Sequence, residues 1–478
     1  MRADTAKPLP IYERLVQEFS SLIDRGKLMP GERMPSVRRL ATQRRISIST
    51  ALQTLRTLEN RGLVEARPQS GYFVRRRSRR LEEPTISRPQ STPSHVDITG
   101  MVASVRAAAQ DPRIVALGTA SPAPQLFPAQ RLQRILSSVT RHKPTLLTTY
   151  GFSSGNAAFR HQLARRYLDW GVSIDEGEFV VTHGCTEAVG LALRAVASVG
   201  DTIAIESPSF YGTLQTIESL NLKVIEIPTH PREGISIEAL EAVMQHHEIK
   251  AAVVMANVSN PLGSIMPDDR KQRLVRMMES RGIPLIEDDI YGDLPFDGPR
   301  PLPLKSFERE GGVMLCSSFS KTLAPGLRVG WIAPGKRLAR IEVLKYVNTL
   351  TTPEVPQLAL AAYLAQGGYD QHLRRIKRAF ASQVRQTTDA VTAHFPHGTR
   401  VTQPLGGFVI WVELPDDVDT MQLYDRAIGA GFSFAPGRIF SASNRYRNCL
   451  RLSCGHPWSS DKEQAIVHLA KLVESHAS

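Results

Sequence analysis

The fold of this chain can be worked out from the stretch Ser317-Ser-Phe-Ser-Lys321-Thr-Leu-Ala-Pro-Gly-Leu-Arg328-Val-Gly330. A short apolar run at residues 313–316 comes directly before it and is typical of a buried strand. This strand leads into serine hydroxyls and a lysine, and an arginine follows seven residues after the lysine. Most lysines are solvated surface charges, so Lys321 acquires meaning only from the residues that accompany it.

The middle of the chain alternates between strand-like and helix-like patterns. Helical periodicity is found at residues 187–198, 237–245 and 268–281. Short apolar runs typical of strands lie around these helices, at residues 179–182, 202–206, 223–227, 251–255, 283–286 and 313–316. Such alternation predicts an α/β unit built on a mostly parallel sheet. Binding sites in sheets of this kind form at the carboxyl ends of the strands.

Unusual polar residues follow several of these strands. Gly184-Cys185-Thr186 leads from one strand into a helix whose first amides suit a phosphate, although a plain strand–helix turn is the commoner explanation of such a pattern. Asn260 follows another strand, and acidic residues including Asp288 come directly after the apolar run at 283–286. One ligand accounts for the set together with Lys321. Pyridoxal 5′-phosphate carries a phosphate, a ring nitrogen that pairs with an acid, and an aldehyde that condenses with a lysine.

These blocks resemble the class I aminotransferases of fold-type I over roughly residues 100–475. The resemblance rests on Asn260-Pro-Leu-Gly263, on Asp288-Asp-Ile-Tyr291, and on Ser318-Phe-Ser-Lys321 followed by Arg328-Val-Gly330. It implies that Lys321 forms the internal aldimine with pyridoxal 5′-phosphate and that Asp288 pairs with the pyridinium nitrogen. It also implies that Asn260 and Tyr291 hydrogen-bond the ring oxygen.

The same resemblance implies the remaining contacts. The phosphate is assigned to a set of backbone and side-chain donors, namely the amides of Gly184, Cys185 and Thr186 together with Ser318 and Arg328. Phe210 is expected to stack on the ring, with Tyr211 as the alternative. Tyr150 resembles the tyrosine that reaches the phosphate of the partner subunit, which implies a homodimer. Arg451 matches the arginine that grips a substrate carboxylate with both nitrogens, and residues 406–413 belong to a smaller C-terminal lobe.

One motif also fits a different chemistry. Ser318-Phe-Ser-Lys321 matches the S-x-x-K nucleophile motif of penicillin-recognising enzymes. The companion motifs S-D-N and K-T-G are absent from the sequence, and here the block follows the last strand of an α/β unit. The histidines have no grouping typical of a metal site, so no metal is expected.

The net charge of +13 is concentrated at the N-terminus. Residues 1–80 carry 18 of the 59 Lys and Arg residues but only 7 of the 46 Asp and Glu residues. The rest of the chain is therefore almost neutral. A basic block joined to a near-neutral body predicts a module that binds a polyanion, such as double-stranded DNA.

The pattern within this block predicts a winged helix-turn-helix. A helix at residues 11–24 is followed by a short helix capped by Ser36 and a longer one capped by Ser47. Ile48 is expected on the buried side of the longer helix, with Leu52, Leu55 and Leu58. Two short strands, 63–67 and 71–74, form the wing. The helix that starts at Ser47 would read the major groove.

Residues 8–74 also resemble the GntR family of bacterial transcription regulators, through Pro30-Gly-Glu-Arg-Met-Pro-Ser-Val-Arg38 and Ser70-Gly71-Tyr-Phe-Val74. The resemblance implies that Arg38 contacts a phosphate or a base edge and that Gly71 lies at the wing tip near the minor groove. Ser47, Ser49 and Thr50 are implied to face the DNA. The family often has arginine where this chain has Ile48, so Arg44, Arg45 or Gln53 are expected to carry more of the base reading.

The predicted organisation is multidomain: a DNA-binding domain at residues 8–76, a linker at 77–97 and an aminotransferase-like domain at 98–478. The linker begins with a basic run and continues rich in Pro, Ser and Thr, with few apolar residues to form a core. Its basic start could touch DNA, and a purely solubilising tether is an equal alternative. The N-terminus has no signal-peptide pattern, and the four cysteines form no C-x-x-C pair. With no apolar run long enough to span a membrane, a cytoplasmic protein is expected.

The complete arrangement resembles the MocR subgroup of GntR regulators. It implies a cytoplasmic transcription regulator that senses a small amine, an amino acid or pyridoxal 5′-phosphate itself through the Lys321 aldimine. It also implies a head-to-tail homodimer that binds an operator. Two alternatives remain open: a catalytically active class I aminotransferase with an accessory DNA-binding domain, and a DNA-binding scaffold that no longer binds the coenzyme.

Overall fold

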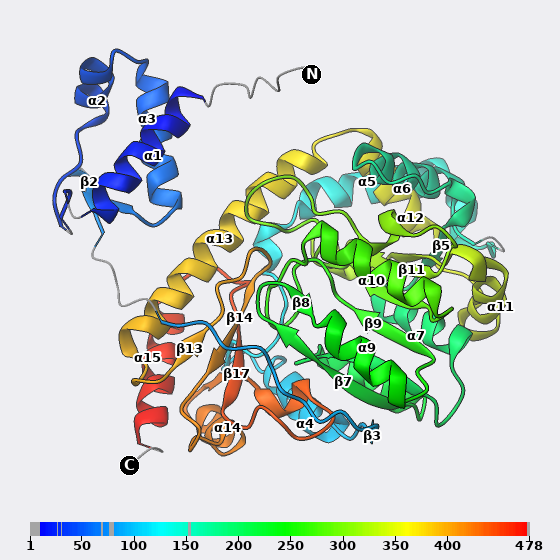
Figure 1. Ribbon diagram of the computed structural model, residues 1–478. Helices are drawn as coiled ribbons and strands as arrows, with labels where there is room; N and C mark the ends of the chain where they lie inside the picture. The colour runs from blue at the N-terminus through cyan, green and yellow to red at the C-terminus, as the bar shows by residue number, and fades with distance from the viewer. Residues whose placement is uncertain are drawn as a thin grey trace, which may run out of the picture. The chain divides into compact units, whose positions relative to one another are not determined.

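The chain forms two units that meet in sequence at Arg80 and Leu81 (Figure 1). The computed structural model describes residues 10–25, 27–29, 31–67, 70–75, 81–151 and 154–475. The basic run predicted to begin the linker lies outside these residues from 76 to 80. The two units are therefore treated separately.

The first unit has the predicted helices and wing. Its elements are α1 (Ile11–Asp24), α2 (Val37–Arg44), α3 (Ile48–Asn60) and the antiparallel strands β1 (Val64–Arg67) and β2 (Gly71–Val74). The predicted caps are confirmed, because the hydroxyl of Ser36 accepts the N–H of Arg39 and that of Ser47 accepts the N–H of Thr50. Val16, Phe19, Leu40, Leu55 and Leu58 are among the buried residues that hold the unit together.

The prediction that Ile48 is buried is wrong. Its exposed fraction is 60%. The buried face of α3 is formed by Ala51, Leu55 and Leu58, with Thr54 beside them. Ile48 continues this face by one turn, but it is the first residue of the helix and lies beyond the end of the apolar core. A large apolar side chain is thus left in solvent at the start of the helix.

The second unit is built on a twisted sheet that is parallel through its middle. Its strands are β3 (Ser94–His95), β5 (Val180–Thr182), β6 (Thr202–Ser207), β7 (Lys223–His230), β8 (Gly234–Ile235), β9 (Ala251–Val254), β10 (Leu285–Asp288), β11 (Val313–Ser318) and β12 (Gly330–Ala333). The order is β3-β7-β6-β9-β10-β11-β12-β5, with β8 paired to β7. Neighbours from β7 to β11 are parallel and β12 is antiparallel to both its neighbours. The predicted, mostly parallel α/β sheet is confirmed.

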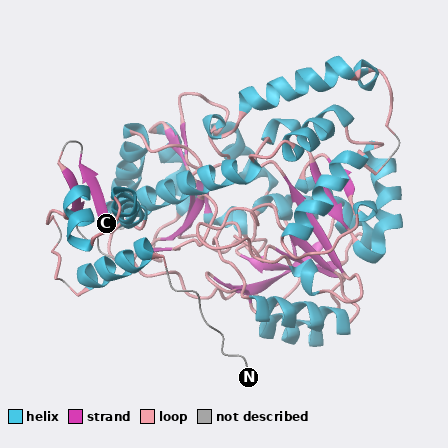
Figure 2. Cartoon of the chain, turned by 90° about the horizontal axis from the view of Figure 1, so that it is seen from above, coloured by secondary structure: helices cyan, strands magenta, loops and turns pink. Residues whose placement is uncertain are grey.

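Helices lie on both sides of these strands, as Figure 2 shows. They are α4 (Thr99–Ala108), α5 (Ala129–His142), α6 (Ala157–Asp169), α7 (Cys185–Val196), α8 (Tyr211–Ser219), α9 (Ile237–His246), α10 (Asp268–Ser280), α11 (Leu338–Thr349) and α12 (Glu354–Ala365). With both faces covered, the central strands are buried along their whole length, which is why they are read in the sequence as continuous apolar runs.

One strand boundary differs from the prediction. The sequence places the acidic residues directly after an apolar strand at 283–286, whereas Glu287 and Asp288 lie within β10 and are both buried. Buried carboxylates persist when hydrogen bonds replace their water. The carboxylate of Glu287 accepts the backbone N–H groups of Leu304 and Lys305, at 2.6 and 3.1 Å.

A smaller C-terminal lobe is built on a second sheet. Its strands, in order, are β13 (Arg400–Val401), β14 (Val409–Glu413), β17 (Cys449–Ser453) and β16 (Ala435–Pro436). The helices of the lobe are α13 (Tyr369–His394), α14 (Thr420–Gly429) and α15 (Ser460–Glu474). A short parallel pair, β4 (Val115–Ala116) with β15 (Phe432–Ser433), joins the lobe to an earlier segment of the chain.

Residues 81–97, called the strap below, are packed on the second unit. Composition places them in a linker, yet Leu81 and Val96 are buried and β3 pairs with the edge of the central sheet. The strap packs with few apolar residues because the side chains of Ser87 and Glu83 form hydrogen bonds with the backbone of Thr229 and Gln403.

Among the helices formed by the described residues, none is long and apolar enough to cross a membrane.

Gly330 lies where β12 approaches β11 and the residue before α7 closely. A Cβ at this position would lie 2.6 Å from the carbonyl carbon of Gly184 and 2.8 Å from the oxygen of Ser317, and neither backbone can move freely. We expect Gly330→Ala to lower the free energy of unfolding by about 1–3 kcal/mol, the usual cost of overpacking. Chemical denaturation of the full chain measures this change.

Gly326→Ala is the matched control, since a Cβ there meets nothing within 4 Å. It should change stability by no more than about 0.5 kcal/mol. Equal effects of the two substitutions would show that the close approach at Gly330 does not constrain the fold.

Candidate functional site

A pocket lies at the carboxyl ends of β10 and β11, where parallel sheets form their sites. Its lining brings together residues that are far apart in the sequence: Cys185, Thr186, Phe210, Met255, Asp288, Tyr291 and Lys321 are among them. Six of these seven are residues that the sequence predicts for the cofactor site. Met255 is the exception, and its sulfur accepts the backbone N–H of Asn260 at 3.1 Å.

Lys321 is the amine of this pocket. Its Nζ donates a hydrogen bond to the carbonyl oxygen of Ala120 at 2.7 Å. Burial lowers the pKa of Lys321 to about 8, and the positive charges of Arg451 and Arg328 act in the same direction, while Asp288 opposes them. An amine with this pKa is about one-tenth neutral at pH 7, far more than an ordinary lysine. The neutral fraction is the nucleophilic one.

Asp288 is the acid of the pocket. Burial raises the pKa of its carboxyl to about 6, although hydrogen bonds from the thiol of Cys185 (3.2 Å) and the amide of Ile290 (3.2 Å) oppose the shift. The carboxylate form therefore predominates at neutral pH. Such a group can hold a proton on a basic ring nitrogen placed against it.

Tyr291 brings a buried hydroxyl to the same pocket. This oxygen has no partner in hydrogen-bond geometry among the described residues, although the Asn260 side chain is near enough to lower its pKa slightly. Burial dominates and raises the pKa of Tyr291 well above its usual value. A buried, unpaired hydroxyl is costly, so this atom is suited to a hydrogen bond with a ligand.

Arg451 lies on β17 of the C-terminal lobe and is fully buried. Its Nη1 donates to the side-chain oxygen of Asn260 at 3.0 Å, and its Nη2 donates to the carbonyl of Gly118. Its Nε has no partner in the described part of the chain. The two hydrogen-bond acceptors of this guanidinium among the described residues are therefore neutral, whereas a buried charge is normally paired with an opposite one. The site is therefore suited to an anionic ligand.

The start of α7 and Arg328 form a second part of the site. Gly184 adopts a φ of +92° as the residue before α7, and a Cβ there would lie 2.5 Å from Nη2 of Arg328. The guanidinium donates to the carbonyl of His183 at 2.9 Å and to the hydroxyl of Ser320 at 3.3 Å. Free helix amides beside an arginine make an arrangement suited to phosphate.

Ser320 is a residue that the sequence analysis does not assign. The predicted phosphate ligand Ser318 instead has its hydroxyl accepting the N–H of Ser320 at 3.2 Å. Both serines belong to the Ser-Phe-Ser-Lys motif, and their roles could be separated only by knowing which side of the turn faces Arg328.

The aromatic predictions have different outcomes. Phe210 lines the pocket. Tyr211, the alternative, does not belong to the lining, and its ring centroid lies 5.4 Å from the guanidinium carbon of Arg451. Tyr150 is 75% exposed and does not line the pocket either.

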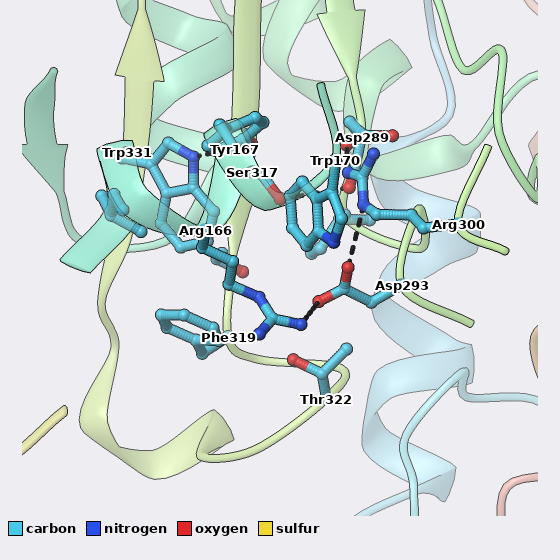
Figure 3. A pocket seen from close by; sticks show the side chains of 13 residues that line it. Arg166, Tyr167, Trp170, Asp289, Asp293, Arg300, Ser317, Phe319, Thr322 and Trp331 are labelled. Atoms are coloured by element: carbon cyan, nitrogen blue, oxygen red, sulfur yellow. Dashed lines mark hydrogen bonds and ion pairs between the residues drawn. The ribbon is translucent and has the colours of Figure 1, made fainter. Parts of the chain in front are cut away.

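A second polar cluster surrounds Asp289, the residue that follows Asp288 (Figure 3). Arg300 pairs with Asp289 and with Asp293, the latter at 2.9 Å, and stacks on Trp170. Arg166 lies 3.6 Å from Asp293. These charges pair with one another, so the cluster fixes the turn that carries Asp288 and Tyr291. The sequence offers no signal for it, because the partners come from separate segments.

The predicted DNA-contacting residues lie on the surface of the first unit. Arg38, Arg45, Gln53 and Gly71 are exposed. Arg44 is also exposed but forms an ion pair with Glu18.

The hydroxyls at the start of α3 are partly occupied within the unit. Ser47 Oγ lies 2.7 Å from that of Ser49 and 2.8 Å from the hydroxyl of Thr50. The side chain of Ile48 is exposed to solvent at the same end of the helix.

Comparison with known proteins identifies both units. Residues 11–74 match the family described as bacterial regulatory proteins, gntR family, and residues 94–467 match aminotransferase class I and II. The chain is 38% identical to the uncharacterized HTH-type transcriptional regulator YjiR of Escherichia coli, over 97% of this chain and 98% of that protein. It is 36% identical to YdcR of the same organism, over 97% and 99% of the two chains.

Solved structures resemble the second unit. LysN, an alpha-aminoadipate aminotransferase from Thermus thermophilus complexed with N-(5′-phosphopyridoxyl)-L-leucine, is 26% identical, with a TM-score of 0.72 over 80% of this chain and 99% of that one. The residues of the pocket fit pyridoxal 5′-phosphate: an amine of lowered pKa, an ionised acid, an unpaired tyrosine hydroxyl and a phosphate cradle. Pyridoxal 5′-phosphate is the cofactor of this fold. The chain belongs to the MocR-type GntR transcription regulators, in which a GntR DNA-binding unit precedes an aminotransferase-like unit.

Proposed function

We propose that this regulator senses a small amine, an amino acid or pyridoxal 5′-phosphate itself at the Lys321 pocket and changes its binding to operator DNA in response. One observation carries the proposal. Arg451 lies close enough to Lys321 to lower the pKa of this amine. The hydrogen bonds of the two cationic groups go to backbone carbonyls and one amide oxygen instead of carboxylates. A ligand that carries both an amino group and a carboxylate is complementary to this arrangement.

The coenzyme supplies an aldehyde on an electron-withdrawing ring, which exchanges one amine for another. In the proposed site Lys321 is the resident amine, Asp288 holds a proton on the ring nitrogen, and Tyr291 donates its unpaired hydroxyl to the ring oxygen, assisted by Asn260. The phosphate cradle consists of the amides of Gly184, Cys185 and Thr186 with Ser318 and Arg328. Phe210 packs on the ring, and Arg451 holds the carboxylate of the effector.

The regulator is proposed to act in the cytoplasm as a homodimer, with residues 8–76 binding DNA and 98–478 binding the effector. Tyr150 supports a shared site, since it is mostly exposed and lies outside its own pocket. A largely apolar groove between α5, α6 and α12, with Leu147 exposed nearby, supports a second copy as the partner. The proposed dimer is head-to-tail, and light scattering of the full chain measures its mass.

Lys321→Ala tests the proposal directly. The purified wild-type chain should show the visible absorbance band of bound coenzyme, change it on addition of amino compounds, and change its affinity for the DNA upstream of its own gene. The variant should show no band and no effector response while it still binds that DNA. Lys336→Ala, which alters an exposed lysine after β12, should behave as the wild type. A wild-type protein that binds no specific DNA at physiological salt would contradict the proposal.

The pKa of Lys321 gives a pH dependence. Below pH 8 the amine is mostly protonated and does not react, so the rate at which added pyridoxal 5′-phosphate develops its visible band should rise with pH, with a midpoint near 8, and level off at higher pH. Arg451→Met removes a neighbouring positive charge, which should raise the pKa of Lys321 and move this midpoint to higher pH. Stopped-flow absorbance measures both curves. A midpoint near the ordinary lysine value in the wild type would show that Lys321 is not perturbed.

A second function is supported by the polar groups in and near the pocket. Lys321, Asp288 and Tyr291, which line it, and Arg451 would also serve a catalytically active aminotransferase. Repeated conversion of an amino donor to its keto acid would establish turnover. A spectral change limited to a single turnover supports the sensor.

Ile48 gives a prediction about DNA reading. It is the exposed apolar residue at the start of the proposed reading helix, and in the major groove such a side chain contacts the methyl group of thymine. Replacing one contacted thymine by uracil, which lacks this methyl, should weaken wild-type binding by about 0.8 kcal/mol, or about fourfold in Kd.

Ile48→Ala should remove most of this difference between thymine and uracil. The substitutions are made one thymine at a time in a site selected from random DNA. Uracil effects of the same size in both proteins at every position would exclude a methyl contact by Ile48.

A further inference from the structure

The strap contacts both the central sheet and the C-terminal lobe near its beginning. The carboxylate of Glu83 accepts Nε of Arg232, in the loop after β7, and the backbone N–H of Gln403, between β13 and β14, at 3.0 Å. The adjacent carbonyl of Glu82 accepts the N–H of Val401 at 2.9 Å. The first residues of the strap therefore bridge the two parts of the second unit.

Ser87 attaches the strap to the ends of two central strands. Its hydroxyl donates to the carbonyl of Ser207, the last residue of β6, and accepts the N–H of Thr229 on β7 at 2.8 Å. The backbone N–H of Ser87 donates to the carbonyl of Thr229 at 3.3 Å. A single side chain thus satisfies polar groups of both strands.

A buried carboxylate extends this junction to the C-terminal lobe. Glu226 is 2% exposed and accepts hydrogen bonds from the hydroxyls of Ser207 (2.9 Å), Ser441 (3.0 Å) and Ser443. The hydroxyl of Ser207 also lies 2.7 Å from that of Tyr446. Loss of any one donor would leave the buried carboxylate short of a partner. Breaking a single hydrogen bond of this junction is therefore costly, and its groups are expected to move together.

The junction is connected to the proposed ligand site from both sides. Ser207 lies three residues before Phe210, which lines the pocket. The N–H of Ser209 donates to the carbonyl of Phe440 at 2.9 Å, and the Phe440 ring lies 5.0 Å from the guanidinium of Arg451. Movement of residues 207–210 or of Arg451 would therefore displace Ser207, whose carbonyl is bonded to Ser87 of the strap.

A ligand that contacts Asp288 and Arg451 together bridges the central sheet and the C-terminal lobe, and the strap bridges the same two parts. We propose that the strap, attached through Glu83 and Ser87, is the element that transmits occupancy of the pocket to the DNA-binding unit. This inference rests on the proposed function. Chain connectivity supplies the last step, since the strap begins at Leu81, directly after the first unit. Single hydrogen bonds are weak enough to be redistributed by a ligand and strong enough to bias two states.

The test uses the full chain and two probes. N-(5′-phosphopyridoxyl)-L-leucine carries a phosphate, a pyridine ring and a carboxylate in one stable molecule, whereas pyridoxal 5′-phosphate lacks the carboxylate. The variants are Glu83→Ala and Ser87→Ala. Thr85→Ala is the matched control, because Thr85 is an exposed hydroxyl residue on the same strap between the two attachment points. Each protein is measured for probe affinity, for amide hydrogen exchange in residues 81–97, and for DNA affinity with and without probe.

In the wild type and Thr85→Ala, we expect the leucine compound to alter exchange in the strap and change the Kd for DNA more than pyridoxal 5′-phosphate does. In Glu83→Ala and Ser87→Ala, we expect probe affinity to stay within about twofold while at least half of the DNA response, on a logarithmic scale, is lost. Thermal unfolding checks that these variants remain folded.

Two results would overturn the inference: unaltered exchange in the wild-type strap when the leucine compound binds, or a full DNA response in both variants. Failure of the proposed function looks different. In that case the wild-type chain does not bind the compound, or binds it with no change in DNA affinity whatever the strap does.

Discussion

Asp288 and Lys321 share one pocket, and the attraction between their opposite charges opposes the cost of burying each of them. The sheet makes this possible because β10 and β11 are parallel neighbours, with Asp288 opposite Cys316. Both strands end at the same edge of the sheet, and Tyr291 follows the first of them and Lys321 the second. Neighbouring groups support this pair: Arg300 binds Asp289, the next residue, and the thiol of Cys185 donates to Asp288 itself.

Two further cations make the balance of charge in the pocket uneven. Arg451 and Arg328 both lower the pKa of Lys321, and Asp288 alone does not compensate for them. The site therefore favours anionic groups as well as amines. The same property would serve an enzyme that binds amino acids and the sensor that we propose. The feature of this chain that a class I and II aminotransferase match leaves unexplained is the basic GntR unit at residues 11–74.

Much of this arrangement could be predicted from the sequence, because the motifs sit at strand ends and strand ends are visible as the limits of apolar runs. Asn260, Asp288, Tyr291, Lys321 and Arg328 are placed at strand ends in this way. The strand order that brings them together is not predicted, because apolar runs do not indicate which strands are neighbours. The contacts that could not be predicted join distant backbone groups. Nothing in the sequence marks the carbonyl of Ala120 as the partner of Lys321, 201 residues away.

The predictions for the strap and for Ile48 differ from the structure for related reasons. Composition identifies segments without a core of their own, yet a polar segment can lie on another surface through side-chain hydrogen bonds, as Glu83 and Ser87 do. Helical periodicity gives the buried face of α3 but not the point at which the core beneath it ends. Both errors concern which residues from other parts of the chain pack against a segment, and this depends on the tertiary structure.

The thiol of Cys185 has a consequence outside ligand recognition. It is buried, donates its hydrogen to Asp288, and burial holds its pKa well above the usual value. Oxidants and electrophiles react with thiolates, and a thiol in this state forms almost none. The other cysteines, Cys316, Cys449 and Cys454, are also buried and free. The thiol beside Asp288 is therefore poorly reactive towards oxidants and electrophiles.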